Sequence, residues 1–124
     1  MEARGLFRVP GRLTGPTGNS EDVELLVDTG ATLLVVPAPL AQRLELVARH
    51  IQAVLIAGGR RASWPVAEVR LGLDGSEVTT PCFIVPSGPA LLGAVALESL
   101  FLAVDPVAKR LVPGEGLALT GTAG

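Results

Sequence analysis

The segment 24–37, ELLVDTGATLLVVP, is apolar almost throughout, but it contains Asp28, Thr29 and Gly30 near its centre. A carboxylate buried alone in an apolar core is costly, so it must be neutralised or find a partner. A strand leading into Asp28 would carry the carboxylate to its end, and Gly30 would let the backbone turn sharply there. The pattern predicts a carboxylate at the tip of a rigid loop whose amide groups can donate hydrogen bonds to it.

Two other interpretations start from the same residues. Asp28 could cap an ordinary turn, because Asp, Thr and Gly are all frequent in turns. It could also be an aspartyl nucleophile, but phosphatases of that kind have a second Asp two positions later, where this chain has Gly30. The related ion pumps have Lys directly after the Asp, where this chain has Thr29. These two phosphoryl-transfer interpretations are therefore excluded, and an ordinary turn remains open as the alternative to a catalytic loop.

Composition limits the other functions that the chain could have. Its 124 residues are 48% hydrophobic and 3% aromatic, with a net charge of -2, which fits one domain with an aliphatic core. A nucleic-acid partner is not expected, because the chain lacks a basic face with stacking aromatics. With one histidine and one cysteine, neither a metal site nor another cofactor is expected. Cys82 is expected to be a small buried hydrophobe.

The apolar stretches predict a cytoplasmic protein with no membrane partner. The first residues, MEARGLFRVPGR, carry charges where a signal peptide needs a continuous apolar run. The most apolar stretch, 89–104, contains Glu98 and is shorter than the roughly 18 residues of a membrane span. The single cysteine also fits a reducing compartment.

Turn residues divide the chain into short apolar segments with the lengths of strands. We expect strands over residues 5–13, 23–27, 32–37, 50–57 and 63–73, and hairpins over 72–85 and 101–113. Asp74-Gly75 is the turn signal of the first hairpin, and Asp105-Pro106 lies at the turn of the second. Residues 1–113 are therefore expected to form one mainly β domain, a closed barrel or small sandwich, and residues 114–124 a flexible tail.

Two short helices are expected between these strands. The apolar residues of PLAQRLELV have the spacing of one helical face: Leu40, Ala41, Leu44 and Val47. The second helix is expected within ALLGAVALESL, residues 90–100, after a strand end and Gly93.

Together these features resemble the retropepsin-like aspartic proteases in their small single-domain form. The apolar strand followed by Asp28-Thr29-Gly30-Ala31 is similar to the catalytic loop of that family. About 30 residues later, the hairpin around Gly58-Gly59 lies where the family carries its flap. Leu91-Leu92-Gly93 and the following AVALESL are similar to the family's apolar-apolar-Gly element and the helix after it. FLAVDPVAKRLVP resembles the final strands of prokaryotic members, so the similarity covers roughly residues 5–113.

The resemblance implies a closed β-barrel that is active as a homodimer and hydrolyses peptide bonds. In this family the catalytic Asp pairs with the same residue of a second copy, so two Asp28 side chains would meet across a two-fold axis. They would share one proton, one carboxylate drawing a proton from water while the other donates a hydrogen bond to the scissile carbonyl. Thr29 and Gly30 would complete the catalytic loop. The residues expected to contact an extended peptide or protein substrate are Ala31, Gly58, Gly59, Arg60 and Leu92.

Some residues depart from the family pattern or allow two roles. Viral members have an acidic residue and an Arg that brace the loop, and these positions are Thr32 and Ala94 here. Arg60 and Arg61 could favour acidic peptides or simply keep the hairpin end solvated. Trp64 could line a pocket near the flap or pack beneath it.

One alternative function comes from a different class. The chain could be a catalytically silent dimeric β domain that binds extended peptides or serves assembly. The two interpretations differ in whether two Asp28 side chains meet below an open cleft.

Overall fold

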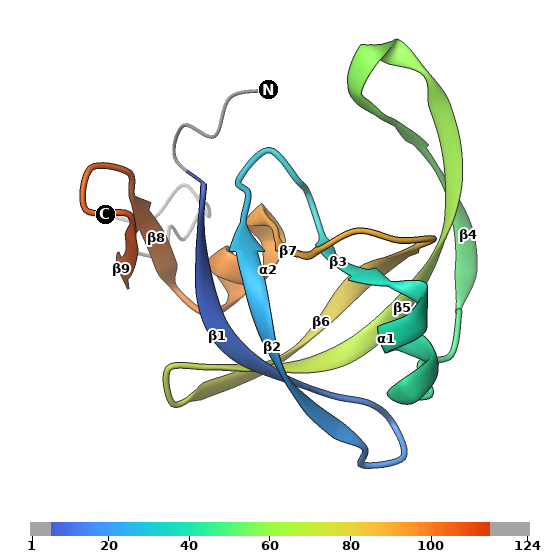
Figure 1. The fold of residues 1–124 in the computed structure, drawn as a ribbon, viewed down its shortest axis with the longest axis horizontal. Helices are drawn as coiled ribbons and strands as arrows, with labels where there is room; N and C mark the ends of the chain where they lie inside the picture. The colour runs from blue at the N-terminus through green and yellow to red at the C-terminus, as the bar shows by residue number, and fades with distance from the viewer. Residues whose placement is uncertain (1–5, 115–124) are drawn as a thin grey trace, which may run out of the picture.

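The computed structural model describes residues 6–114 and shows a mainly β fold with two short helices (Figure 1). The tail predicted for 114–124 lies outside the described residues apart from Gly114. The strands are β1 Phe7–Thr14, β2 Ser20–Val27, β3 Leu34–Pro37, β4 His50–Leu55, β5 Arg61–Leu73, β6 Ser76–Val85, β7 Ala90–Leu92, β8 Leu102–Asp105 and β9 Arg110–Pro113. The helices are α1 Ala38–Arg43 and α2 Ala94–Ser99, and a 3-10 turn covers Ala57–Gly59.

Six strands close into a barrel, which confirms the prediction of a mainly β fold with a closed barrel. The main sheet has the order β1-β2-β7-β3-β6-β5-β4, and pairing between β1 and β5 closes the barrel. β7 lies between β2 and β3, parallel to β2 and antiparallel to β3. The chain therefore places the segment just before α2 beside the strand that leads into Asp28.

The long strand β5 joins the barrel to a two-stranded ribbon. Its first half, as far as Val66, pairs with β4, whereas its second half pairs with β6. In Figure 1 this β4–β5 ribbon, residues 50–66, rises beyond the barrel and ends at the 3-10 turn. β4 has β5 as its one strand neighbour among the described residues, so its other edge is open.

The core of the barrel is aliphatic, as the composition predicts. Its fully buried members come from most strands and include Leu13, Leu25, Leu34, Leu71 and Leu92. Cys82 is also completely buried, which confirms that it is a small core residue. Burial raises the pKa of its thiol to about 12, because the charged thiolate would lose its hydration there.

The first helix ends earlier than its apolar spacing predicts. α1 stops at Arg43, and Val47 is 67% exposed, so the prediction that Val47 belongs to the apolar helical face is wrong. Glu45 adopts a φ of 55°, and the Leu46 N–H donates to the Ala41 carbonyl at 3.0 Å. This is the left-handed helix end that glycine usually makes.

Hydrogen bonds from another turn explain how a glutamate takes this position. The Glu45 carboxylate accepts hydrogen bonds from Thr17 at 3.1 Å and from Asn19 at 2.8 Å. Both donors lie in the β1–β2 turn, far from Glu45 in the sequence. Tertiary contacts therefore stabilise a conformation that the local sequence does not favour.

The two predicted hairpin turns are confirmed. Asp74 and Gly75 have φ values of 54° and 86°, which is the turn geometry typical of an Asp-Gly pair. In the β8–β9 hairpin the Asp105 carboxylate accepts hydrogen bonds from the Val107 and Ala108 amides, both at 3.1 Å. Within residues 6–114, no helix is long and apolar enough to span a bilayer.

Candidate active site

Asp28 lies at the end of β2, in a loop over residues 28–33 that we call the Asp28 loop. Its amide donates to the Leu92 carbonyl at 3.0 Å, and its carbonyl accepts from the Ala31 amide at 3.0 Å. The Gly30 amide donates to Oδ1 of the Asp28 carboxylate, also at 3.0 Å. Asp28 is half-buried, while Thr29 and Gly30 are exposed. The carboxylate is thus held by the loop's own amide, as the sequence pattern predicts.

A second set of backbone hydrogen bonds fixes the Asp28 loop to the start of α2. The Ala94 amide donates to the Ala31 carbonyl at 2.8 Å, and the Val95 amide donates to the Thr32 carbonyl at 2.9 Å. Viral members have an acidic residue and an Arg that form an ion pair where this chain has Thr32 and Ala94. Here the main chain joins these two segments directly.

Gly93 makes this close approach possible. A Cβ atom at Gly93 would lie 2.4 Å from the Leu33 carbonyl oxygen and 2.7 Å from the Ala31 carbonyl oxygen. Real Cβ atoms do not approach backbone this closely, so a side chain would push the loop away from α2. Gly93, the glycine of the apolar-apolar-Gly element, therefore allows the close packing that holds the Asp28 loop in place.

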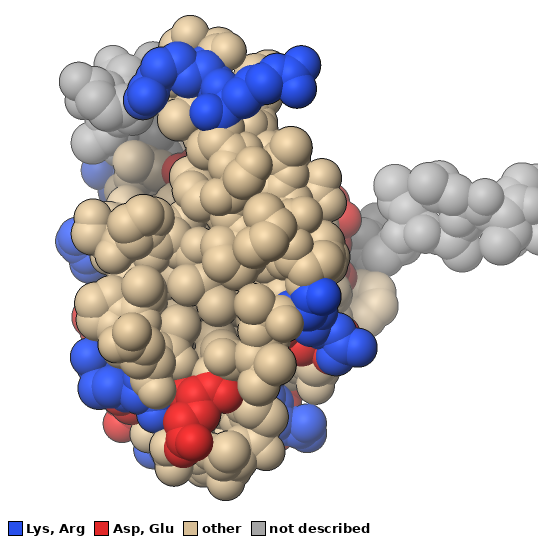
Figure 2. Space-filling view, turned by 90° about the vertical axis from the view of Figure 1, so that its right-hand side faces the viewer, with Lys and Arg blue, Asp and Glu red and all other residues tan. Residues whose placement is uncertain are grey.

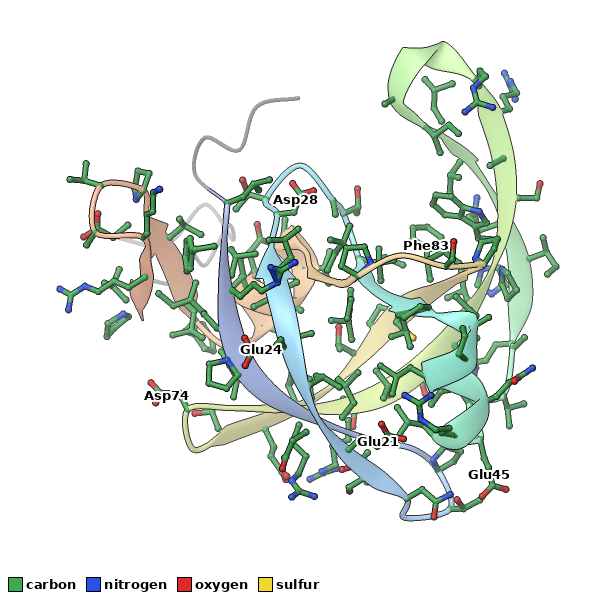
Figure 3. The ribbon with its side chains drawn as sticks, viewed as in Figure 1. Glu21, Glu24, Asp28, Glu45, Asp74 and Phe83 are labelled. Atoms are coloured by element: carbon green, nitrogen blue, oxygen red, sulfur yellow. The ribbon has the colours of Figure 1, made fainter. Side chains whose placement is uncertain are left out.

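Within residues 6–114, no second acidic group accompanies Asp28. Among residues 6–114 its carboxylate has one hydrogen-bond partner, the Gly30 amide, and takes part in no ion pair. Figure 3 shows the other labelled carboxylates well away from the Asp28 loop, toward the lower part of the barrel: Glu21, Glu24, Glu45 and Asp74. No group of three potential metal ligands occurs within the described part of the chain.

A groove of about 740 Å³ opens beside the Asp28 loop. Its walls come from the loop, from the ribbon and from the ends of β3, β6 and β7. The residues that line it are Gly30, Ala31, Thr32, Leu33, Val35, Gln52, Ala53, Val54, Leu55, Ile56, Ala57, Trp64, Phe83, Val85, Pro86, Ser87, Pro89 and Leu91. None of these side chains is charged, so the groove suits an apolar segment of an extended chain.

Trp64 connects the ribbon to the floor of the groove. Its ring meets the Phe83 ring edge to face, with centroids 5.6 Å apart and an interplanar angle of 67°. Trp64 is half-buried and also lines the groove. Both roles considered for it from the sequence therefore apply, because the underside of the ribbon is one wall of the groove.

The predicted substrate-contact residues fall into three groups. Ala31 lines the groove, whereas Gly58, Gly59 and Arg60 lie at the ribbon tip, beyond its walls. Leu92 is completely buried and does not line the groove, so its prediction as a substrate-contact residue is wrong for its side chain. Its carbonyl instead accepts the hydrogen bond from the Asp28 amide.

Several groove residues were not predicted from the sequence. Leu91 lines the groove because it precedes Leu92 in β7, and neighbouring strand residues point to opposite faces. Phe83, which is labelled in Figure 3, lines the same groove from β6. Alternation along β7 is a signal that could have separated Leu91 from Leu92, but the contribution of Phe83 depends on strand pairing.

Comparisons with known proteins define the class of this small barrel and its Asp-Thr-Gly loop. The aspartyl protease family model matches residues 9–96, and the chain belongs to this family. The structure of the retroviral (EIAV) protease complexed with the inhibitor HBY-793 superposes with a TM-score of 0.61 at 18% sequence identity. The match covers 77% of this chain and 88% of that chain, and it confirms the retropepsin-like fold. No match was found among curated protein sequences.

Proposed function

We propose that the protein is a homodimeric aspartic endopeptidase whose single active site contains the Asp28 carboxylates of two copies. The observation that carries the proposal is a half-buried Asp28 held beside an uncharged groove, with no second carboxylate of the described residues bonded to it. Membership of the aspartyl protease family supports a peptide-bond hydrolase. Aspartic protease chemistry needs two carboxylates that share a proton, so a second copy must supply the missing one.

The proposed chemistry assigns one task to each carboxylate. The ionised Asp28 removes a proton from water, and the protonated Asp28 donates a hydrogen bond to the scissile carbonyl oxygen. The Gly30 amide orients the carboxylate through its hydrogen bond to Oδ1, 3.0 Å long. Because exactly one proton must be shared, the rate should have a bell-shaped dependence on pH with its maximum on the acid side of neutrality.

The groove and the open edge of β4 would hold the substrate. Residues 52–57 of the ribbon line the groove continuously, and β4 has a free edge there. An extended peptide could pair with this edge through main-chain hydrogen bonds while its apolar side chains fill the groove. Gly58 and Gly59, with φ values of 87° and 79°, form the tip of the ribbon that would act as the flap.

Mixing wild-type chains with Asp28→Asn chains tests the shared site. If two copies of Asp28 build one site, equal amounts of scrambled chains leave about a quarter of the wild-type activity, the square of the wild-type fraction. Two independent sites per dimer would leave about half. The chains must be refolded together, and exchange must be verified with a tag on one version.

Asp74→Asn is the matched control for this substitution. It makes the same chemical change at an exposed turn with a φ of 54°, which asparagine tolerates well. Mixtures with this variant should keep the full activity. Activity near one half with Asp28→Asn, despite verified exchange, would exclude a shared site, and full activity of pure Asp28→Asn protein would exclude Asp28 from the mechanism.

A further inference from the structure

The ribbon tip carries two arginines whose charges are not compensated within residues 6–114. Figure 2 shows basic side chains over the top of the molecule, above a broad surface without charged side chains. Neither Arg60 nor Arg61 forms an ion pair or a side-chain hydrogen bond with a described residue. Other arginines do have carboxylate partners: Arg12 with Asp22 at 3.2 Å, Arg43 with Glu21 at 2.6 Å, Arg49 with Glu68 at 3.3 Å and Arg70 with Glu77 at 3.0 Å.

Strand register places the two arginines on opposite faces of the ribbon. The Ile56 amide donates to the Arg60 carbonyl at 2.8 Å, which continues the β4–β5 pairing to this position. Because side chains alternate along a strand, Arg60 shares a face with Ile56 and Trp64. Arg61 pairs with Leu55 and shares the other face.

Burial shows which face is turned toward the groove. Ile56 and Trp64 are half-buried, whereas the Leu55 side chain on the other face is 72% exposed, although all three residues border the groove. Arg60 therefore extends the groove-side face beyond the last apolar residue, and Arg61 belongs to the outward face. The groove itself offers no carboxylate that could pair with Arg60.

We propose that Arg60 selects peptides that carry an acidic side chain flanking the apolar residues bound in the groove. This inference rests on the proposed function, because it names the substrate class of the same site. A guanidinium binds a carboxylate through two parallel hydrogen bonds, and no described carboxylate of the chain competes for Arg60. The uncharged walls would accept the apolar part of the same peptide.

Matched fluorescent peptides test the preference by binding and by cleavage. The peptides share an apolar centre and differ at the flanking positions, which carry Glu, Gln or Lys. Binding is measured by anisotropy with the Asp28→Asn protein as the parent, and cleavage is measured with Asp28 intact. The Glu peptides should be preferred to the Gln peptides by about two- to fivefold, the range of an exposed ion pair. The preference should fall as salt is added.

Arg60→Gln and Arg61→Gln separate the two faces of the ribbon. In both assays Arg60→Gln should lose the preference for Glu, whereas Arg61→Gln should keep it. An equal preference in Arg60→Gln and its parent, equal loss in both variants, or no binding of any peptide would overturn the inference. If the Asp28→Asn protein binds Glu peptides with the expected preference while the wild-type protein cleaves none, the inference stands as a binding specificity and the proposed protease function fails.

Discussion

The Asp28 loop and the ribbon bound the same groove, but they are supported in different ways. The loop is joined to β7 and α2 by backbone hydrogen bonds, and its Ala31 and Leu33 carbonyls pack closely against Gly93. The ribbon is a two-stranded element whose β4 residues are nearly all exposed, and its open edge faces away from β5. A site that holds one wall rigid and leaves the other weakly supported can keep its carboxylate in place while it admits a chain.

Amide hydrogen exchange should show the largest difference between the two regions. The Asp28 amide donates to Leu92 at 3.0 Å, and the Ile56 amide donates to Arg60 at 2.8 Å, so both are hydrogen-bonded. Exchange at the Asp28 amide requires this end of the barrel to open, whereas exchange at the Ile56 amide requires only that the two strands of the ribbon separate. We expect exchange at Ile56 to be at least about a thousandfold faster. Similar exchange rates in NMR measurements would contradict the difference in support.

Gly93→Ala should produce the next largest effect, through the rigid region. The new Cβ would meet the Leu33 carbonyl oxygen at 2.4 Å, and backbone atoms cannot give way as a flexible side chain can. We expect a loss of at least about 3 kcal/mol in the free energy of unfolding, or failure to fold. Urea denaturation followed by circular dichroism measures this loss. A variant with wild-type stability would show that the contact between loop and helix is not tight.

The contrast between α1 and the hairpin turns explains which parts of the fold could be predicted from the sequence. Asp74-Gly75 favours its turn through its own backbone, so the sequence predicts it correctly. Glu45 ends α1 because Thr17 and Asn19 bind its carboxylate, and no local pattern contains that information. The end of a short helix is therefore decided by a contact between distant turns.

The same physical distinction applies to the candidate site. Asp28, Thr29 and Gly30 are adjacent in the chain, so the motif and its strand predict the loop. The prediction that the Leu92 side chain contacts substrate was wrong: alternation places Leu91 and Leu92 on opposite faces of β7, but which of them faces the core depends on the pairing of β7 with β2. Trp64 and Phe83 meet only through the pairing of β5 with β6.

Cys82 offers a smaller effect that depends on the barrel and not on the ribbon. It pairs with Leu34, which directly follows the Asp28 loop, and burial raises its pKa from 9.0 to about 12. Above pH 9 the unfolded chain loses the thiol proton while the folded chain keeps it, so stability falls as pH rises from about 9 toward 12. The loss should be at most about 1.4 kcal/mol per pH unit.

Urea denaturation at pH 8 and at pH 10.5 measures this pH dependence, and Cys82→Ala is the control. The chain contains no tyrosine, so few other groups titrate in this range. The variant should be less stable at both pH values but should lose less stability between them. A thiol that reacts with Ellman's reagent at pH 8 as fast in the folded protein as in urea would contradict its burial.

The smallest effect on stability is expected from Gly58→Ala. This variant replaces glycine by alanine in the ribbon, as Gly93→Ala does beside the Asp28 loop. Gly58 has a φ of 87°, and a Cβ there would have no atom within 4 Å, so the substitution is opposed by backbone conformation alone. A residue with a Cβ in the left-handed conformation costs about 1 kcal/mol of conformational free energy relative to glycine. The free energy of unfolding should fall by the same amount. If the ribbon acts as the flap of the proposed protease, its tip changes its backbone angles on closing, and the effect on peptide cleavage should then exceed the effect on folding.

Stability and cleavage must therefore be measured on the same Gly58→Ala preparation, beside Gly93→Ala. We expect a small shift in the urea midpoint together with a clear fall in kcat/KM, since the variant folds but closes less readily. Loss of stability as large as that of Gly93→Ala would mean that the ribbon tip is packed as tightly as the Asp28 loop. Unchanged kcat/KM in a stably folded variant would contradict the proposal that the tip changes its backbone conformation during turnover.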